Sequence, residues 1–161
     1  MRILRATVPA VAAAVALAAC APTAASPPRV TDYAGIDREF QAAKTGLDLP
    51  PGATWPAHEE KPGPDAGPDP QYESGGGTVD AQMYWMCSWS AEWLTVHAAD
   101  PSRAATAVAE LDKVEQSYLY LHGLDQNWRR HLNQAVTGAK AQDPAAVRRV
   151  VADCASFLSQ T

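Results

Sequence analysis

The sequence predicts an all-α protein, a small antiparallel four-helix bundle preceded by a short helix and a long Pro/Gly-rich segment. The first observation is regular helix punctuation, because aspartates that can cap a helix precede four segments and a proline follows two of these caps. The second is apolar spacing of three and four residues, which gathers the apolar side chains on one helix face. Short connections between such helices favour antiparallel neighbours.

The four predicted helices lie within residues 80–161, which we treat as the bundle. Their caps are Asp80, Asp100, Asp125 and Asp143, and Gly123 ends the second helix. The predicted helices cover residues 81–99, 101–122, 126–142 and 145–160. The apolar stripes of the last three consist of Ala104, Val108, Leu111, Val114, Tyr118 and Leu121; of Trp128, Leu132, Ala135, Val136 and Ala139; and of Val147, Val150, Val151, Cys154, Phe157 and Leu158.

Residues 31–79 precede the bundle and change character midway. Residues 31–44 have Ile36, Phe40 and Ala43 at helical spacing, which predicts a short helix. Residues 47–78 contain seven prolines and six glycines, and this composition excludes a long helix or a central strand. We expect Pro50 to Trp55 to dock on the domain and residues 59–70 to be mobile.

The first 19 residues have the pattern of a secretory signal peptide. Two arginines precede an uncharged run rich in alanine and valine that extends from residue 6 to residue 19. A membrane span needs about 20 apolar residues, so this run is too short to cross a bilayer.

The signal ends in Leu17-Ala18-Ala19-Cys20, which resembles the lipobox of bacterial lipoproteins at each position. The resemblance implies cleavage before Cys20, transfer of a diacylglyceryl group to its sulfur and further acylation of the new amino terminus. Two acyl chains hold a protein on a membrane, whereas one chain holds it only marginally. The alternative is an incidental cysteine beside an ordinary cleavage site. Residues 20–30 then form a lipidated cysteine and a flexible stalk, on the extracytoplasmic face of the cell membrane.

Composition and charge limit the function classes. Removal of residues 1–19 takes away two arginines and leaves 142 residues, enough for one domain, with 11 basic and 18 acidic side chains and a formal charge of −7. A domain this acidic is a poor candidate for binding nucleic acid or for electrostatic docking on anionic lipid. Abundant Ala, Arg, Asp and Pro with little Ile, Asn and Lys suggests the GC-rich genome of an actinobacterium.

Once Cys20 is lipidated, Cys87 and Cys154 remain, and two cysteines in an exported chain indicate one disulfide. The alternative is a pair of buried free thiols. Cys87 lies about 10 Å along the first bundle helix, and Cys154 lies at a similar distance from the end of the fourth. In an antiparallel pair of helices the two sulfurs would therefore meet at one level.

Trp85, Trp89 and Trp93 lie four residues apart and form a ridge on the first bundle helix. Indole rings give large contact areas, so the three tryptophans and Trp55 are candidate binding residues for a glycan or a partner peptide. The alternative is that Trp55 and its segment cover the ridge, or that the ridge is part of the core, and aromatic stripes at helical spacing are usually buried. We favour burial, above all for Trp89.

No pattern of catalytic, metal-binding or cofactor-binding residues stands out. The four histidines lack the i,i+4 spacing of a helical zinc site, and the sequence contains neither a GxSxG motif nor a phosphate-binding loop. The sequence therefore predicts no catalytic residue, no metal site and no cofactor.

The segments YWMCSWSAEWL, LPPGATWP, YESGGG and VVADCASFL together resemble small secreted lipoproteins of actinobacteria. This resemblance implies a small secreted helical domain and supplies no activity. We therefore expect a non-enzymatic envelope lipoprotein that binds a protein or glycan partner. One alternative is a carrier of a small apolar ligand, which a pocket lined by Trp85 and Trp89 would favour. The other is a cell-wall-modifying hydrolase, which a histidine–carboxylate cluster in a cleft would favour.

Overall fold

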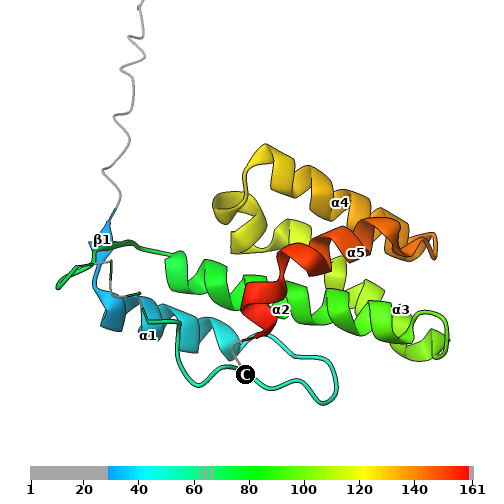
Figure 1. Ribbon diagram of the computed structural model, residues 1–161, viewed down its shortest axis with the longest axis horizontal. Coiled ribbons are helices and arrows are strands. Elements are labelled where there is room, and N and C mark those ends of the chain that lie inside the picture. Colours follow the sequence, from blue (N-terminus) through cyan, green and yellow to red (C-terminus); the bar gives the residue numbers. More distant parts are fainter. Residues whose placement is uncertain (1–28, 62, 64, 66, 160–161) are drawn as a thin grey trace, which may run out of the picture.

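The computed structural model describes residues 29–61, 63, 65 and 67–159, and this part of the chain is mostly helical (Figure 1). The expected signal peptide, Cys20 and the stalk up to residue 28 lie outside the described residues. None of the described helices is both long enough and apolar enough to cross a membrane.

The predicted short helix is α1, Tyr33–Lys44, and the side chain of Asp32 caps it by accepting a hydrogen bond from the Gly35 N–H. A two-stranded antiparallel sheet lies beside its start. Strand β1, Val30–Thr31, pairs with β2, Tyr72–Glu73, so the start of α1 lies beside the end of the Pro/Gly-rich segment. The sequence did not predict these two strands, and each is too short to give an alternating pattern.

The central helix, α2, spans Gly76–Val96 and begins five residues before the position expected from Asp80. Its N-cap is Gly75, which has a φ of 98° that glycine adopts without steric cost. The Gly75 N–H donates to Glu39 Oε2 of α1. A tertiary contact therefore starts this helix, and Asp80 lies within its second turn instead of at its cap.

Helix α3, Pro101–Leu111, begins at the predicted Asp100 cap but ends eleven residues before the predicted end. The chain continues as a 3₁₀ helix, η2 (Val114–Gln116), and a π-helical turn, η3 (Leu119–Gly123). Ser117 between them has an extended backbone, and the Leu119 N–H donates to Gln82 Oε1 of α2 instead of to a carbonyl of its own helix.

Because of this break, the apolar stripe predicted for the second bundle helix is wrong after Ser117. The stripe predicts that Tyr118 and Leu121 are buried, but they are 40% and 54% exposed. The prediction assumes one continuous 3.6-residue period through Ser117, and the extended backbone at this residue rotates the side chains after it out of that register.

The last helices largely follow their predicted caps. Asp125 caps α4, Gln126–Lys140, and Asp143 caps α5, Pro144–Asp153. The predicted fourth helix divides at Cys154, where α5 ends and a single turn, α6 (Ala155–Leu158), begins.

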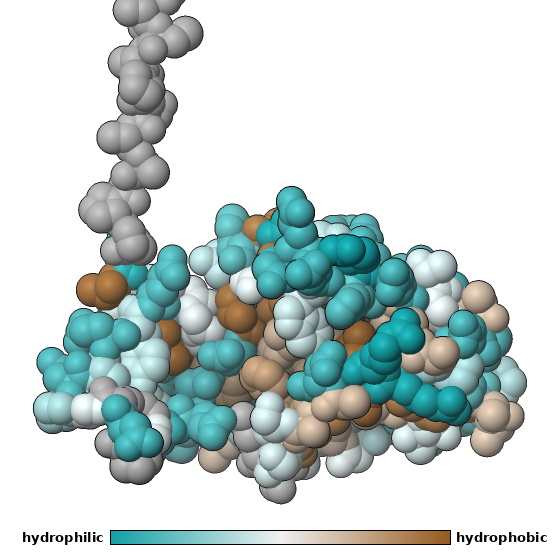
Figure 2. Space-filling model, turned by 45° about the horizontal axis from the view of Figure 1, so that its top comes forward, coloured by the Kyte–Doolittle hydropathy of each residue, from teal (hydrophilic) through white to brown (hydrophobic). Residues whose placement is uncertain are grey.

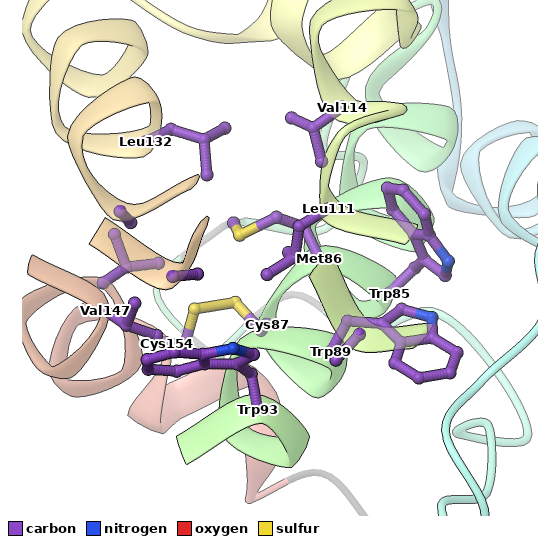
Figure 3. Packing of buried hydrophobic residues seen from close by; sticks show 14 of the residues in the cluster. Trp85, Met86, Cys87, Trp89, Trp93, Leu111, Val114, Leu132, Val147 and Cys154 are labelled. Carbon is purple, nitrogen blue, oxygen red and sulfur yellow. A yellow bond between two sulfur atoms is a disulfide. The ribbon is translucent and has the colours of Figure 1, made fainter. Parts of the chain in front are cut away.

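Figure 1 shows α2 in the middle of the fold, with α1 on one side of it and the α4–α5 pair on the other, and α3 packs on α2 and reaches α4. The predicted disulfide between Cys87 and Cys154 is present, with an S–S distance of 1.98 Å, and it joins α2 to the end of α5. Figure 3 shows it in the centre of the apolar cluster. The cluster consists of Met83, Trp85, Met86, Cys87, Trp89, Trp93, Val96, Ala104, Ala107, Leu111, Val114, Leu119, Leu124, Leu132, Ala135, Ala139, Ala146, Val147, Val150 and Cys154.

The first half of the Pro/Gly-rich segment packs on the helices. Leu47, Leu49 and Trp55 contact the core cluster, and Pro50 and Pro56 are buried. Residues 56–59, which we call the strap, are held on α1 through their carbonyl groups. Lys44 Nζ donates to the Pro56 carbonyl, Gln41 Nε2 to that of Ala57 and Tyr33 Oη to that of Glu59. Glu59, which the sequence analysis placed in the segment expected to be mobile, is therefore held on α1.

Candidate functional site

The three tryptophans of α2 are core residues. Trp85, Trp89 and Trp93 are 2%, 4% and 0% exposed, and Figure 3 shows their rings within the apolar cluster. Trp89 Nε1 donates to the Asp48 carbonyl at 2.8 Å, and this bond links α2 to the first half of the Pro/Gly-rich segment, which we call the docked segment. The Trp93 ring stacks on His97 with centroids 4.6 Å apart. The ridge is therefore not an open surface in this structure.

Trp55 is half-buried and covers part of the interface between α1 and α2. Its ring lies 5.3 Å from that of Tyr84 and meets the Phe40 ring edge-on at 6.2 Å. The ammonium of Lys44 lies over both the Phe40 and the Trp55 rings. The four candidate tryptophans thus do not form one surface, because Trp55 packs at α1 while the other three face the core.

A small recess of about 280 Å³ lies at Trp85, between the docked segment and η2. Trp89 does not line it, and Asp48, Glu110 and Lys113 do. Ionised side chains around so small a volume suit an apolar ligand poorly. A pocket lined by both Trp85 and Trp89, which would have favoured a carrier of a small apolar ligand, is therefore not found at this site.

A second recess, of about 550 Å³, lies between the strap and α6 and is lined by His58, the histidine of a histidine–carboxylate pair. His58 Nδ1 lies 3.1 Å from Asp37 Oδ2, and Ser156 and Ser159 line the same recess. The Ser159 hydroxyl donates to the Ser156 carbonyl, and neither serine bonds the imidazole. His58 is 69% exposed, so its ring is held from one side only.

Asp37 is held in place by more hydrogen bonds than His58. Its carboxylate accepts hydrogen bonds from the Glu59 N–H at 2.9 Å and from Gln41 Nε2 at 3.2 Å. The bond from the Glu59 backbone, together with smaller contributions from His58 and Gln41, holds the pKa of Asp37 below its usual range, although partial burial opposes this shift. Asp37 therefore stays ionised and orients both the strap and the imidazole.

Glu59 is the most perturbed acid of the described chain. Burial, with the neighbouring Asp80 carboxylate as the next cause, raises its pKa to about 7. Burial and the charge of Glu60 also raise the pKa of Asp80. Glu59 Oε2 and the Tyr72 hydroxyl are buried with no hydrogen-bond partner among the described residues. The folded protein therefore accommodates the protonated, neutral form of Glu59 more easily than the carboxylate.

The α4–α5 groove, of about 790 Å³, is larger than either of these recesses. It follows one face of α4 from end to end and is bounded by α5 on the other side. Its lining consists of Gln126, Arg129, Arg130, Asn133, Gln134, Thr137, Gly138, Ala141, Asp143, Ala146 and Arg149. A Cβ at Gly138 would lie 2.9 Å from the Asp143 carbonyl oxygen, so this glycine lets the two helices approach at the closed end of the groove.

Three arginines give the groove its charge. Arg129 donates to the Leu121 carbonyl and lies over the Tyr120 ring, and Arg130 donates to Asn127 Oδ1. Three basic side chains elsewhere in the structure form ion pairs: Arg103 pairs with Glu92, Lys113 with Glu110, and Lys140 with Asp112. No ion pair neutralises an arginine of the groove in the part of the chain that the structure describes. Figure 2 shows strongly hydrophilic side chains gathered over the α4–α5 side of the molecule.

Sequence reasoning missed this groove, although a signal was present. Two arginine pairs, 129–130 and 148–149, occupy the polar faces of consecutive helices, and the tryptophans are the more conspicuous feature of the sequence. It also missed the His58–Asp37 pair and the partly buried Glu59, because the strap brings these residues together across an irregular segment that has no periodicity.

Within the described ranges, no group of three or more His, Cys, Asp and Glu side chains is placed to hold a metal ion. Comparison with known proteins found no matching family model, no similar curated protein and no similar solved structure, so the site must be interpreted from its own geometry.

Proposed function

We propose that the chain is an envelope lipoprotein, anchored through Cys20 on the extracytoplasmic face of the membrane, whose helical domain binds a protein or glycan partner without catalysis. We further propose that α2 to α5 act as an antiparallel four-helix bundle, preceded by α1, and that the partner occupies the α4–α5 groove. The observation that carries this proposal is the groove itself, an open recess lined by three arginines that no carboxylate pairs with in the described structure.

Two features support a binding role for a rigid module. The disulfide and the buried tryptophans lock α2 to α5, and α5 forms one wall of the groove. A preorganised wall lowers the cost of ordering an interface. The short distance to the anchor is the second feature: the nine residues between Cys20 and Val30 span at most about 30 Å even when fully extended. The groove would thus work close to the membrane face.

Site-specific photocrosslinking in the native cell tests the proposal. A photoreactive residue at Thr137, which is exposed and lines the groove, should give a discrete adduct with one envelope component. The matched control is Thr106, an exposed threonine on α3 away from the groove. Adducts of equal intensity from both positions, or none from Thr137, would contradict the proposal.

One observation favours a second candidate, a hydrolase. His58, which is paired with Asp37, lines a recess together with the exposed Ser156, and a histidine oriented by a carboxylate is the base of a serine-hydrolase triad. We rank it second because neither serine bonds His58 and the imidazole is largely exposed. A fluorophosphonate probe distinguishes the two. We expect no labelling, whereas labelling that Ser156→Ala abolishes would replace the binding proposal.

A further inference from the structure

We propose that the ligand of the α4–α5 groove is an acidic peptide segment of a partner protein that lies along α4. This inference rests on the proposed function and specifies the partner class of the same groove. The length of the groove, its charge and the composition of its floor support it.

The length of the groove fits a linear ligand. The lining residues of α4 recur every three or four positions from Gln126 to Ala141, which is the spacing of one helix face. Fifteen residues of α-helix rise about 22 Å. An extended peptide covers that distance with about seven residues, at about 3.3 Å per residue. A flat bilayer surface, in contrast, does not enter a recess between two helices.

The charge of the groove selects carboxylates. Arg129, Arg130 and Arg149 line it, and Asp143 is the only acid among the lining residues. The chain as a whole has a formal net charge of −5, so this basic strip is opposite in sign to the rest of the molecule. Guanidinium groups bind carboxylates through two parallel hydrogen bonds, and clusters of arginine recognise acidic motifs in this way.

The floor and walls favour a peptide over a glycan. Gly138, Ala141 and Ala146 are small, so no bulky side chain of these positions fills the groove, and the exposed Ala141 lets a ligand backbone approach closely. The exposed Gln134 carries an amide on this face, which matches the donors and acceptors of a peptide backbone, whereas the Asn133 amide donates to the Tyr120 hydroxyl. No tryptophan, tyrosine or phenylalanine of the described chain lines the groove, so a sugar ring finds no aromatic face on which to stack.

The test is selection from a random library of displayed 12-residue peptides on the full mature protein in neutral detergent. We expect the enriched peptides to be acidic, with Asp or Glu at recurring spacings, and to bind less tightly as salt is raised. The affinity of the best synthetic peptide should fall at least tenfold in Arg130→Glu/Arg149→Glu. Its matched control, Arg38→Glu/Arg148→Glu, changes the charge equally at positions outside the groove and should stay within twofold.

The neutral pair Arg130→Gln/Arg149→Gln provides a second measurement that does not introduce repulsion, and it should also weaken binding. Enrichment without acidic bias, no enrichment, or equal loss in the groove and control variants would overturn the inference. So would binding of phosphatidylglycerol vesicles or of alginate that depends on Arg130 and Arg149 while acidic peptides fail. A Thr137 adduct with a partner that lacks an acidic segment would end this inference and leave the proposed function standing.

Discussion

Glu59 should make the stability of the domain depend on pH between about 5 and 8, and Glu59→Gln should reduce that dependence. The carboxyl is buried beside Asp80, its Oε2 has no hydrogen-bond partner in the described structure, and its pKa in the folded protein is about 7. In the unfolded chain a glutamate titrates near 4.5. Because the pKa is higher in the folded protein, folding favours the protonated carboxyl. Its contribution to the free energy of unfolding is complete below about pH 4.5 and is lost as the pH rises through 7.

The magnitude depends on the size of the shift. One pKa unit corresponds to about 1.4 kcal/mol, so an unscreened group would lose about 3 kcal/mol across the full range. The Glu59 side chain is only partly buried, and screening by solvent reduces this figure to about 1–2 kcal/mol. We therefore expect Glu59→Gln to be about 1–2 kcal/mol more stable than the wild type at pH 8, with a much smaller difference at pH 5.

Urea denaturation of the oxidised protein at pH 5 and pH 8 measures the effect. Asp37 does not interfere in this range, because its pKa is held below the usual range of a carboxyl group. The control is Glu115→Gln, since Glu115 is exposed, and this variant should follow the wild type at both values. The reasoning would be refuted if Glu59→Gln kept the wild-type pH slope or were the less stable protein at pH 8.

Three further predictions concern the core and the anchor. Cys154→Ser, or reduction, should lower the free energy of unfolding by about 4 kcal/mol, because the disulfide closes a loop of 67 residues; calorimetry that shows an unchanged melting temperature would contradict this. Trp89→Ala should cost about 3–5 kcal/mol in chemical denaturation, since the ring is buried and its Nε1–H bonds the Asp48 carbonyl; a variant as stable as the wild type would mean that the ring is not core. Cys20→Ala should move the protein from the membrane to the soluble fraction on detergent partition, and unchanged partition would remove the lipid anchor from the proposal.

The elements that could be predicted from the sequence are those that local chemistry decides. Asp100-Pro101 and Asp143-Pro144 start α3 and α5 as expected, because a capping carboxylate and a proline at the first helical position act within one turn. The elements that could not be predicted depend on distant partners. Gly75 starts α2 through Glu39 of α1, and Gln82 of α2 accepts the bond that reshapes the chain at Leu119.

The candidate site shows the same division. The pairing of Cys87 with Cys154 could be predicted, because helix rise places both residues at one level. Burial of the tryptophan ridge could be expected from its spacing, but the covering segment, with its bond from Trp89 to the Asp48 carbonyl, left no periodic signal. The α4–α5 groove could not be predicted, because it depends on which polar faces of two helices meet. The crossing geometry of the two helices decides this, and the sequence of either helix alone does not determine that geometry.

Photocrosslinking in living cells tests whether the α4–α5 groove holds a partner at the envelope surface. The Thr137 photocrosslinker is introduced in living cells into the wild type, into Arg130→Glu/Arg149→Glu and into Arg38→Glu/Arg148→Glu, with anchoring at Cys20 intact in all three. We expect a discrete adduct in the wild type and in the control pair, and its loss in the groove pair. An adduct of undiminished intensity in the groove pair would show that the groove does not hold the partner.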